Sequence, residues 1–315
     1  MRIPVTTLND GYDFPLLGLG TYKLAPEDVE AVLRRAIELG YRHIDTAAFY
    51  GNEEAVGKAI GDAIAAGDVT REDLFVTTKL WNDDQDRPAA AYQESLKRLN
   101  LEFIDLYLVH WPWPQRGLYV SAFEELVQLQ GMGQLQSVGV ANFYPEVLDE
   151  IIQATGVAPV LNQVELHAGF TQQELRDYHA KHNILTEAWA PLARGKNFDD
   201  PAIAGVAAKY DATPAQVVLA YLLQMGVSVV PKTANLKRLE ENLGALEVSL
   251  DAEDIAALDA VQGERMSGDP LTFPGDGLNT ACAPGAHEGL SDEDRPFFTA
   301  VFHHPTSWRG WSYDH

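Results

Sequence analysis

Short apolar segments alternate with longer amphipathic segments along most of the chain. In the amphipathic segments, apolar residues recur every three or four positions, which is typical of a helix that buries one face. The segment from Pro26 onward is an example, with Val29, Val32, Leu33 and Ile37 on one side. The short segments are mostly apolar throughout, as expected for strands that are covered on both faces. The predicted strands are residues 16–21, 43–47, 74–79, 104–110, 135–140, 160–166, 185–189 and 227–230.

Helical segments separate these predicted strands. They lie at residues 53–65, 122–130, 145–154, 172–182, 203–210, 214–224 and 236–246, with two more that start at Pro26 and after Pro88. Eight uninterrupted strand–helix alternations predict an α/β fold, a closed parallel (β/α)8 TIM barrel. Residues 5–15 contain the tight-turn sequence Asn9-Asp10-Gly11, which predicts an N-terminal hairpin that caps the bottom of the barrel. An extra helix is predicted at residues 251–261.

The end of the chain differs in composition from the rest. Residues 1–261 contain the predicted barrel, and residues 262–315 form a C-terminal tail that is first rich in Gly, Pro and Asp and then in aromatic residues and histidine. Chain ends are often disordered. Disordered segments, however, rarely carry so many aromatic side chains. We therefore expect the tail to fold back on the barrel and pack near the substrate pocket.

The composition fits one large globular domain in the cytoplasm. The chain has 315 residues and 46% hydrophobic content, whereas a typical (β/α)8 barrel takes about 250 residues. It has no apolar run long enough to span a bilayer and no secretory pattern at Met1. A single cysteine, Cys282, excludes an internal disulfide framework and suits a reducing compartment. No Cys/His cluster has metal-ligand spacing, so we expect no metal, and we expect a monomer without membrane contact.

The net charge of the chain limits the kinds of molecule that it can bind. The formal net charge is −23, and a nucleic-acid backbone would be repelled by it, so we expect no nucleic-acid partner. An anionic cofactor would need a local basic site. Gly18 and Gly20 resemble the start of a dinucleotide-binding motif, but the full G-x-G-x-x-G pattern is absent, which disfavours a Rossmann site.

Titratable side chains follow three successive predicted strands. Asp45 ends the second strand, Tyr50 lies in the loop just beyond it, Lys79 ends the third and His110 ends the fourth. One such residue alone is most often a solvated or hydrogen-bonded group. Together they meet at the carboxyl edge of the barrel, where active sites collect. A phenol has an ordinary pKa of about 10, a nearby ammonium favours its ionised form, and a carboxylate holds that ammonium in place. The set therefore suggests a tuned proton donor.

These motifs resemble the aldo-keto reductases, most of all the bacterial 2,5-diketo-gluconate reductases. The likeness lies in residues 40–57, 74–82, 105–112, 137–143, 162–167 and 231–242, and it extends in unbroken order from about Val5 to Val261. It implies that NADPH delivers hydride to an aldehyde or ketone while Tyr50 donates a proton to the carbonyl oxygen. It implies that Lys79, paired with Asp45, lowers the pKa of Tyr50, and that a neutral His110 orients the carbonyl.

The resemblance also implies a cofactor site. Asn142 and Gln163 would hold the nicotinamide amide, and Trp189 would stack on the ring. Ala141 stands where the family often has Ser. Lys232 and Arg238 would bind the 2′-phosphate of NADPH or NADP+ at a helix start. The full set expected to bind the cofactor is Gly20, Thr21, Tyr22, Asp45, Asn142, Gln163, Trp189, Ala190, Leu192, Lys232, Thr233, Ala234, Arg238, Glu241 and Asn242.

An apolar pocket is expected around the reacting carbonyl. Its candidate residues, which follow strand ends, are Tyr22, Phe49, Trp81, His110 and Trp111. Each aromatic residue alone could equally serve ordinary packing, but together they would exclude water. Two alternatives stay open: alcohol oxidation with NADP+, and a non-catalytic nucleotide-sensing subunit on the same fold. The sequence does not name the natural carbonyl substrate.

Overall fold

The chain folds into a closed parallel barrel. The computed structural model describes residues 2–273. Eight parallel strands pair in chain order from β3 to β10, and a parallel bridge between Leu17 and Val229 joins the first segment to the last. The predicted (β/α)8 barrel is therefore confirmed. The strands are β3 (Leu19–Gly20), β4 (His43–Asp45), β5 (Phe75–Leu80), β6 (Leu106–Val109), β7 (Ser137–Ala141), β8 (Leu161–Glu165), β9 (Leu185–Trp189) and β10 (Ser228–Val229).

Several strands are shorter than the apolar pattern predicts. The segment 104–110 was expected to be one strand, but the ladder of β6 begins only at Leu106, although Ile104 is fully buried. Residues next to the ends of the strands are buried in the core, although their backbones do not pair with a neighbouring strand. An apolar pattern reports burial rather than backbone pairing, so the predicted strands extend too far at their ends.

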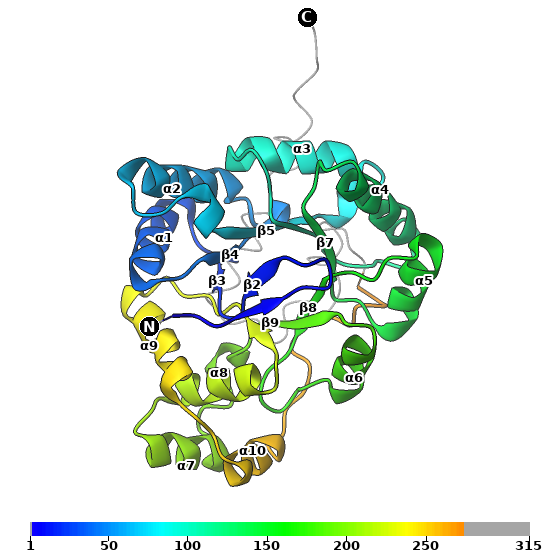
Figure 1. Cartoon of the computed structure of the whole chain (residues 1–315). Coiled ribbons are helices and arrows are strands. Elements are labelled where there is room, and N and C mark those ends of the chain that lie inside the picture. Colours follow the sequence, from blue (N-terminus) through cyan, green and yellow to red (C-terminus); the bar gives the residue numbers. More distant parts are fainter. Residues whose placement is uncertain (1, 274–315) are drawn as a thin grey trace, which may run out of the picture. The chain divides into compact units, whose positions relative to one another are not determined.

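Helices surround the strands, as Figure 1 shows. Many begin at a proline in the first turn, where the missing N–H costs no hydrogen bond. Several predicted bounds are corrected: α4 begins at Tyr119 rather than at 122, α7 begins at Pro201 rather than at 203, and α10 ends at Asp259 rather than at 261. Helix α9 ends at Leu243 rather than at 246, and a 3₁₀ turn covers Gly244–Glu247. The helices are α1 (Pro26–Leu39), α2 (Glu53–Ala66), α3 (Pro88–Leu99), α4 (Tyr119–Gly131), α5 (Pro145–Thr155), α6 (Gln173–Lys181), α7 (Pro201–Tyr210), α8 (Pro214–Gln224), α9 (Leu236–Leu243) and α10 (Ala252–Asp259).

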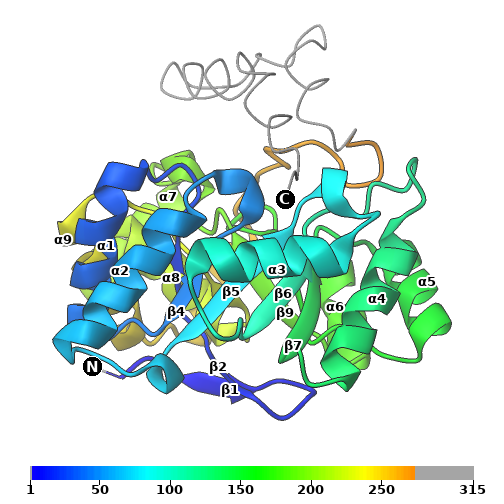
Figure 2. The same ribbon diagram turned by 90° about the horizontal axis from the view of Figure 1, so that it is seen from above.

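The predicted N-terminal hairpin closes one end of the barrel. Strands β1 (Val5–Thr7) and β2 (Asp13–Pro15) pair antiparallel and lie across the barrel end in Figure 2. Phe14, which is fully buried, packs its ring 4.9 Å from that of Phe75 and 4.7 Å from that of His43. This apolar plug seals the amino ends of the strands, so chemistry is left to the opposite rim.

The segment that follows α10 runs along that opposite rim, in orange in Figure 2. The carboxylate of Glu165, at the end of β8, accepts hydrogen bonds from the backbone N–H groups of Met266 at 2.6 Å and Ser267 at 3.0 Å. Residues 1–272 form one compact unit, so the first part of the predicted tail belongs with the barrel. The aromatic part of the tail lies outside the described residues. Among residues 2–273, no helix is long and apolar enough to cross a membrane.

Helix α2 packs so closely on the end of α3 that only a glycine fits. A Cβ on Gly57 would overlap the backbone of Leu99, whereas a Cβ on Gly61, in the same helix, would have no atom within 4 Å. We predict that Gly57→Ala lowers the free energy of unfolding by about 1–3 kcal/mol through overpacking. Gly61→Ala, the matched control, should raise it by about 0.5–1 kcal/mol, because alanine loses less entropy in a helix. Urea denaturation measures both; equal changes would contradict the packing.

Candidate active site

A buried lysine lies at the centre of the rim. The ammonium of Lys79, on β5, donates to both carboxylate oxygens of Asp45 at 2.8 and 2.9 Å and to the carbonyl of Thr46 at 2.8 Å. Its side chain is fully buried. Burying an ammonium costs several kcal/mol unless it is paired and hydrogen-bonded, and these acceptors meet that requirement.

Tyr50 completes the group at the mouth of the barrel. It ends a 3₁₀ turn, Ala48–Tyr50, which stops at Gly51 in the left-handed region with φ 66°. Nζ of Lys79 lies 3.3 Å from the phenol oxygen. The turn therefore returns the phenol to the ion pair at the end of β4, and Asp45, Tyr50 and Lys79 come together as the sequence predicts.

The pKa of Tyr50 differs from the sequence-based prediction. Lys79 was expected to lower it, but burial raises the pKa of the phenol well above 10, and the nearby Asp45 carboxylate raises it further. The physical reason is burial, which disfavours the charged phenolate more strongly than one ammonium, itself paired with Asp45, favours it. Tyr50 is consequently a neutral phenol, the form that can give a proton away.

His110 lies beside the phenol as a neutral imidazole. Its ring centroid is 5.9 Å from that of Tyr50 and 5.2 Å from that of Trp81, and both contacts are edge-on. Burial lowers the pKa of His110 well below 6.5, and the charge of Lys79 lowers it further. A neutral imidazole carries one N–H donor, which agrees with the expected role as a hydrogen-bond donor.

Aromatic rings form a wall around these groups. Phe49 stacks on Trp81 with centroids 3.9 Å apart, and Tyr22 lies 5.1 Å from Tyr50. Trp111 directly follows His110, and its carbonyl accepts a hydrogen bond from Gln85 at 2.8 Å. The structure thus brings Tyr22, Phe49 and Trp81 to the same rim as the proton donor.

The three residues expected to hold the nicotinamide are joined to this cluster by hydrogen bonds. Nε1 of Trp189 donates to Oδ1 of Asn142 at 2.9 Å, and Nδ2 of Asn142 donates to the carbonyl of His110 at 3.0 Å. Nε2 of Gln163 donates to Oδ2 of Asp45 at 2.8 Å. Strand ends β6 to β9 therefore present one connected polar surface beside Tyr50.

The chain matches known proteins over most of its length. Residues 16–262 match the model of the aldo/keto reductase family. The chain belongs to the aldo-keto reductase family. It is 47% identical over 276 residues to the methylglyoxal reductase DkgA of Salmonella typhimurium, covering 86% of this chain and 98% of that protein. It is 44% identical over 273 residues to an aldo-keto reductase of Mycolicibacterium smegmatis, covering 86% and 98%.

Solved structures agree with this assignment. A crystal structure of a Gox0644 mutant in complex with NADPH has a TM-score of 0.80 and is 44% identical to this chain. The match covers 85% of this chain and 97% of the Gox0644 chain. An aldo-keto reductase complexed with NADPH, AKR2E5, has a TM-score of 0.80 and 31% identity, covering 87% and 94%. Both neighbours were determined with NADPH bound.

The reductase has a second expected cofactor region where β3 lies against the segment after β10. Gly20 bridges to Lys232, and a Cβ on Gly20 would lie only 2.8 Å from the carbonyl oxygen of Val230. The hydroxyl of Thr21 is buried and has no hydrogen-bond partner in the part of the chain that the structure describes. An unpaired buried hydroxyl at the rim is free to meet a ligand group.

Helix α9 begins beside this region with exposed cationic side chains. Its N-cap is Asn235, whose side chain accepts from the N–H of Lys237 at 3.0 Å. Lys232 and Arg238 are exposed at this start, and Thr233 is buried. Of the other residues expected to bind the cofactor here, Ala234 is exposed, Glu241 is half-buried and Asn242 is buried. Directly after β9, Ala190 adopts φ 48°, and Leu192 is half-buried in the following loop.

Two buried carboxylates of the reductase escaped the sequence analysis. Glu165 holds the segment at 266–267, as described above. Glu187, in the middle of β9, is fully buried and accepts hydrogen bonds from Gln163 at 2.7 Å and Ser228 at 3.0 Å. The one charged residue in the short strand Leu185–Trp189 is the sequence feature that could have revealed Glu187.

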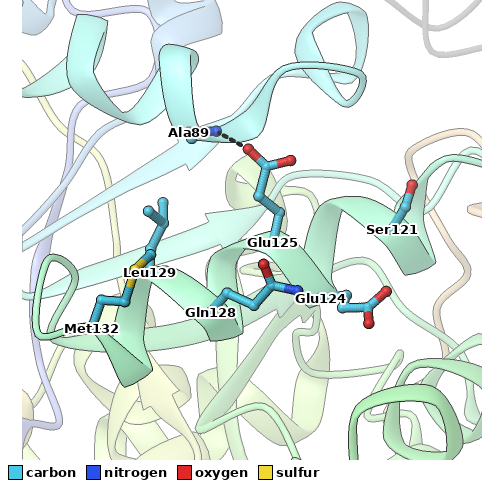
Figure 3. Close-up of a pocket in the computed structure, with 7 residues that line it drawn as sticks. All are labelled: Ala89, Ser121, Glu124, Glu125, Gln128, Leu129 and Met132. Carbon is cyan, nitrogen blue, oxygen red and sulfur yellow. Dashed lines mark hydrogen bonds between the residues drawn. The ribbon is translucent and has the colours of Figure 1, made fainter.

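A separate surface hollow of about 460 Å³ lies on the outer side of α4 and is drawn in Figure 3. One of its carboxylates, that of Glu125, accepts a hydrogen bond from the N–H of Ala89 at 3.1 Å and so caps the start of α3. Its lining residues are Ala89, Ser121, Glu124, Glu125, Gln128, Leu129 and Met132. None of the predicted site residues lines it, so it is not the candidate active site. Among residues 2–273, no group of three or more His, Cys, Asp or Glu side chains could hold a metal ion.

Proposed function

We propose that this aldo-keto reductase reduces aldehydes or ketones to alcohols with NADPH. The observation that carries the proposal is the contact of a neutral Tyr50 phenol with a lysine that is itself held by Asp45, at 3.3 and 2.8 Å. A proton donor beside a fixed positive charge suits a carbonyl oxygen that gains negative charge in the transition state. NADPH, when bound, supplies the hydride.

Each of the clustered side chains has a separate role in the proposed reaction. Tyr50 gives its proton to the carbonyl oxygen, and Lys79 stabilises the negative charge that the phenol oxygen then carries. His110, neutral and beside Tyr50, orients the carbonyl oxygen by donating a hydrogen bond. Phe49 and Trp81 keep water away from the reacting carbon.

The polar groups at the rim fit the cofactor. Asn142 and Gln163 suit its carboxamide, and the unpaired hydroxyl of Thr21 suits a polar group that approaches Gly20. Lys232 and Arg238 at the start of α9 suit the 2′-phosphate, because a helix N-terminus and two cations attract an anion. This local charge is needed in a chain of net charge −23.

The substrate class is supported by the relatives. One protein that is 47% identical is named methylglyoxal reductase, so small 2-oxoaldehydes are the first substrates to try. The segment at 266–267, held by Glu165, supports a role for the start of the tail in shaping substrate choice. We also propose that the chain works as a cytoplasmic monomer. Turnover of NADPH across an aldehyde and ketone panel tests the function; no turnover on any substrate would favour a nucleotide-sensing protein.

We predict that Tyr50→Phe abolishes carbonyl reduction while NADPH affinity is kept. The phenyl ring preserves packing but has no proton to give, and general acid catalysis contributes about 10²–10⁴-fold. Steady-state kcat on a good aldehyde and NADPH binding by fluorescence measure the two effects. Tyr92→Phe is the control, since that phenol bonds the carbonyl of Gln134 away from the site, at 2.9 Å. Near-normal kcat in Tyr50→Phe would show that another group donates the proton.

We predict that Arg238→Ala weakens NADPH binding by about ten- to a hundredfold and barely affects NADH. A hydrogen bond to a charged group contributes about 1.5–3 kcal/mol, and NADH lacks the 2′-phosphate. Lys237→Ala is the matched control, because it removes the same charge from the preceding position of α9 and should change both affinities little. Equal losses for both cofactors in Arg238→Ala would contradict the assignment.

A further inference from the structure

The interior of the barrel holds a second carboxylate beneath the catalytic cluster. Glu187 on β9 is fully buried. One amide links it to the catalytic ion pair: Nε2 of Gln163 donates to Oε2 of Glu187 at 2.7 Å and to Oδ2 of Asp45 at 2.8 Å. Because carboxylates accept these bonds, both hydrogens of the Gln163 amide are used inside the protein. Its Oε1 is therefore the atom of that amide left for a ligand.

The charges around Glu187 do not cancel. Asp45 is balanced by Lys79, which lies 2.8 Å away. Glu187 faces Ser228 on β10, whose hydroxyl donates at 3.0 Å, and His43 on β4, whose Nδ1 lies 3.7 Å from Oε1. Burial lowers the pKa of His43 to about 3, so this imidazole is neutral.

The remaining neighbours add no positive charge. Gln163 on β8 is uncharged, and the Tyr50 phenol, which also feels Glu187, is neutral. Burial, and then the charge of Asp45, raises the pKa of Glu187 to about 8, against the hydrogen bonds from Gln163 and Ser228 and the more distant ammonium of Lys79, which lower it. When ionised, Glu187 therefore adds a negative charge that its neighbours in the described part of the chain leave unmatched.

We propose that Glu187 is a positioning residue that sets the preference of the site for oxidised over reduced cofactor. The inference rests on the proposed function, in which Gln163 holds the nicotinamide carboxamide. The oxidised nicotinamide ring carries a positive charge that the reduced ring lacks, and Glu187 lies one amide away from that contact. Ionised Glu187 favours NADP+, while protonated Glu187 loses that preference.

The sign of the pH dependence follows from linkage. Binding of NADP+ lowers the pKa of Glu187 and releases its proton, whereas binding of NADPH does not. The ratio of the NADP+ dissociation constant to that of NADPH therefore falls as pH rises through the Glu187 pKa. The 2′-phosphate titrates in both cofactors, so its contribution cancels in the ratio.

The test is the affinity of each cofactor across about pH 6 to 10, measured by tryptophan fluorescence quenching on the whole chain. In the wild type the dissociation-constant ratio should fall about tenfold, since one unit of pKa shift corresponds to a factor of ten. Glu187→Gln keeps a carbonyl oxygen for Gln163 but carries no charge, so its ratio should be independent of pH.

Two further variants separate charge from structure. Glu53→Gln is the control: Glu53 is also buried, but it bonds Thr78 and Arg98, each at 2.6 Å, outside the site. It should keep the wild-type pH profile. Ser228→Ala removes a donor that lowers the Glu187 pKa, so it should move the midpoint to higher pH while keeping the carboxylate, and it serves if Glu187→Gln does not fold.

The outcomes are distinct. A wild-type ratio that does not change with pH, a Glu187→Gln profile equal to the wild type, or a Ser228→Ala midpoint that does not move overturns the role of Glu187. A wild type that binds neither cofactor overturns the proposed function instead.

Discussion

The buried pair of Lys79 and Asp45 is the interaction on which the rest of the site depends. An ammonium is stable inside a barrel only if acceptors surround it, and here Asp45 and the carbonyl of Thr46 supply them within 2.9 Å. The closed barrel makes this possible, because neighbouring parallel strands end at one rim. Lys79 in turn fixes the position at which the Tyr50 phenol meets a positive charge.

The candidate site places one ion pair, Lys79 and Asp45, beside two uncharged side chains, Tyr50 and His110. Burial keeps both Tyr50 and His110 uncharged, although it moves their pKa values in opposite directions. This is the expected effect of a low-dielectric site, which disfavours the charged form of each group. A neutral acid and a neutral hydrogen-bond donor beside a fixed ion pair suit a reaction in which charge appears only as the carbonyl is reduced.

The sequence predicts the barrel well because each strand and helix is signalled by residues close together in the chain. Each amphipathic helix follows a buried strand, and the prolines that open α3 and α8 mark helix starts. Strand ends were less predictable, since Ile104 is buried like a strand residue without lying in the ladder. Asp45, Lys79 and His110 could be found because strand ends converge.

The pKa values and the long-range contacts of the site could not be predicted from the sequence, because they depend on the three-dimensional surroundings of each residue. The direction of the Tyr50 pKa shift is set first by the burial of the phenol and then by the nearby Asp45 carboxylate, and residue spacing reveals neither. Glu187 stands out in its strand as the one charged position, but its link to Asp45 through Gln163 appears only in the folded barrel. The hold of Glu165 on Met266 joins residues far apart in the chain, and no local pattern predicts such a pairing.

The central claim, that Lys79 enables proton donation by Tyr50, is tested most directly by the rate of hydride transfer in Lys79→Met. Stopped-flow absorbance of NADPH in a single turnover with a small aldehyde isolates this step, and circular dichroism with NADPH binding verifies that the variant is folded. The rate should fall by about 10²-fold or more, as for the loss of one preorganised electrostatic group. A folded variant that binds NADPH and transfers hydride at the wild-type rate would contradict the account.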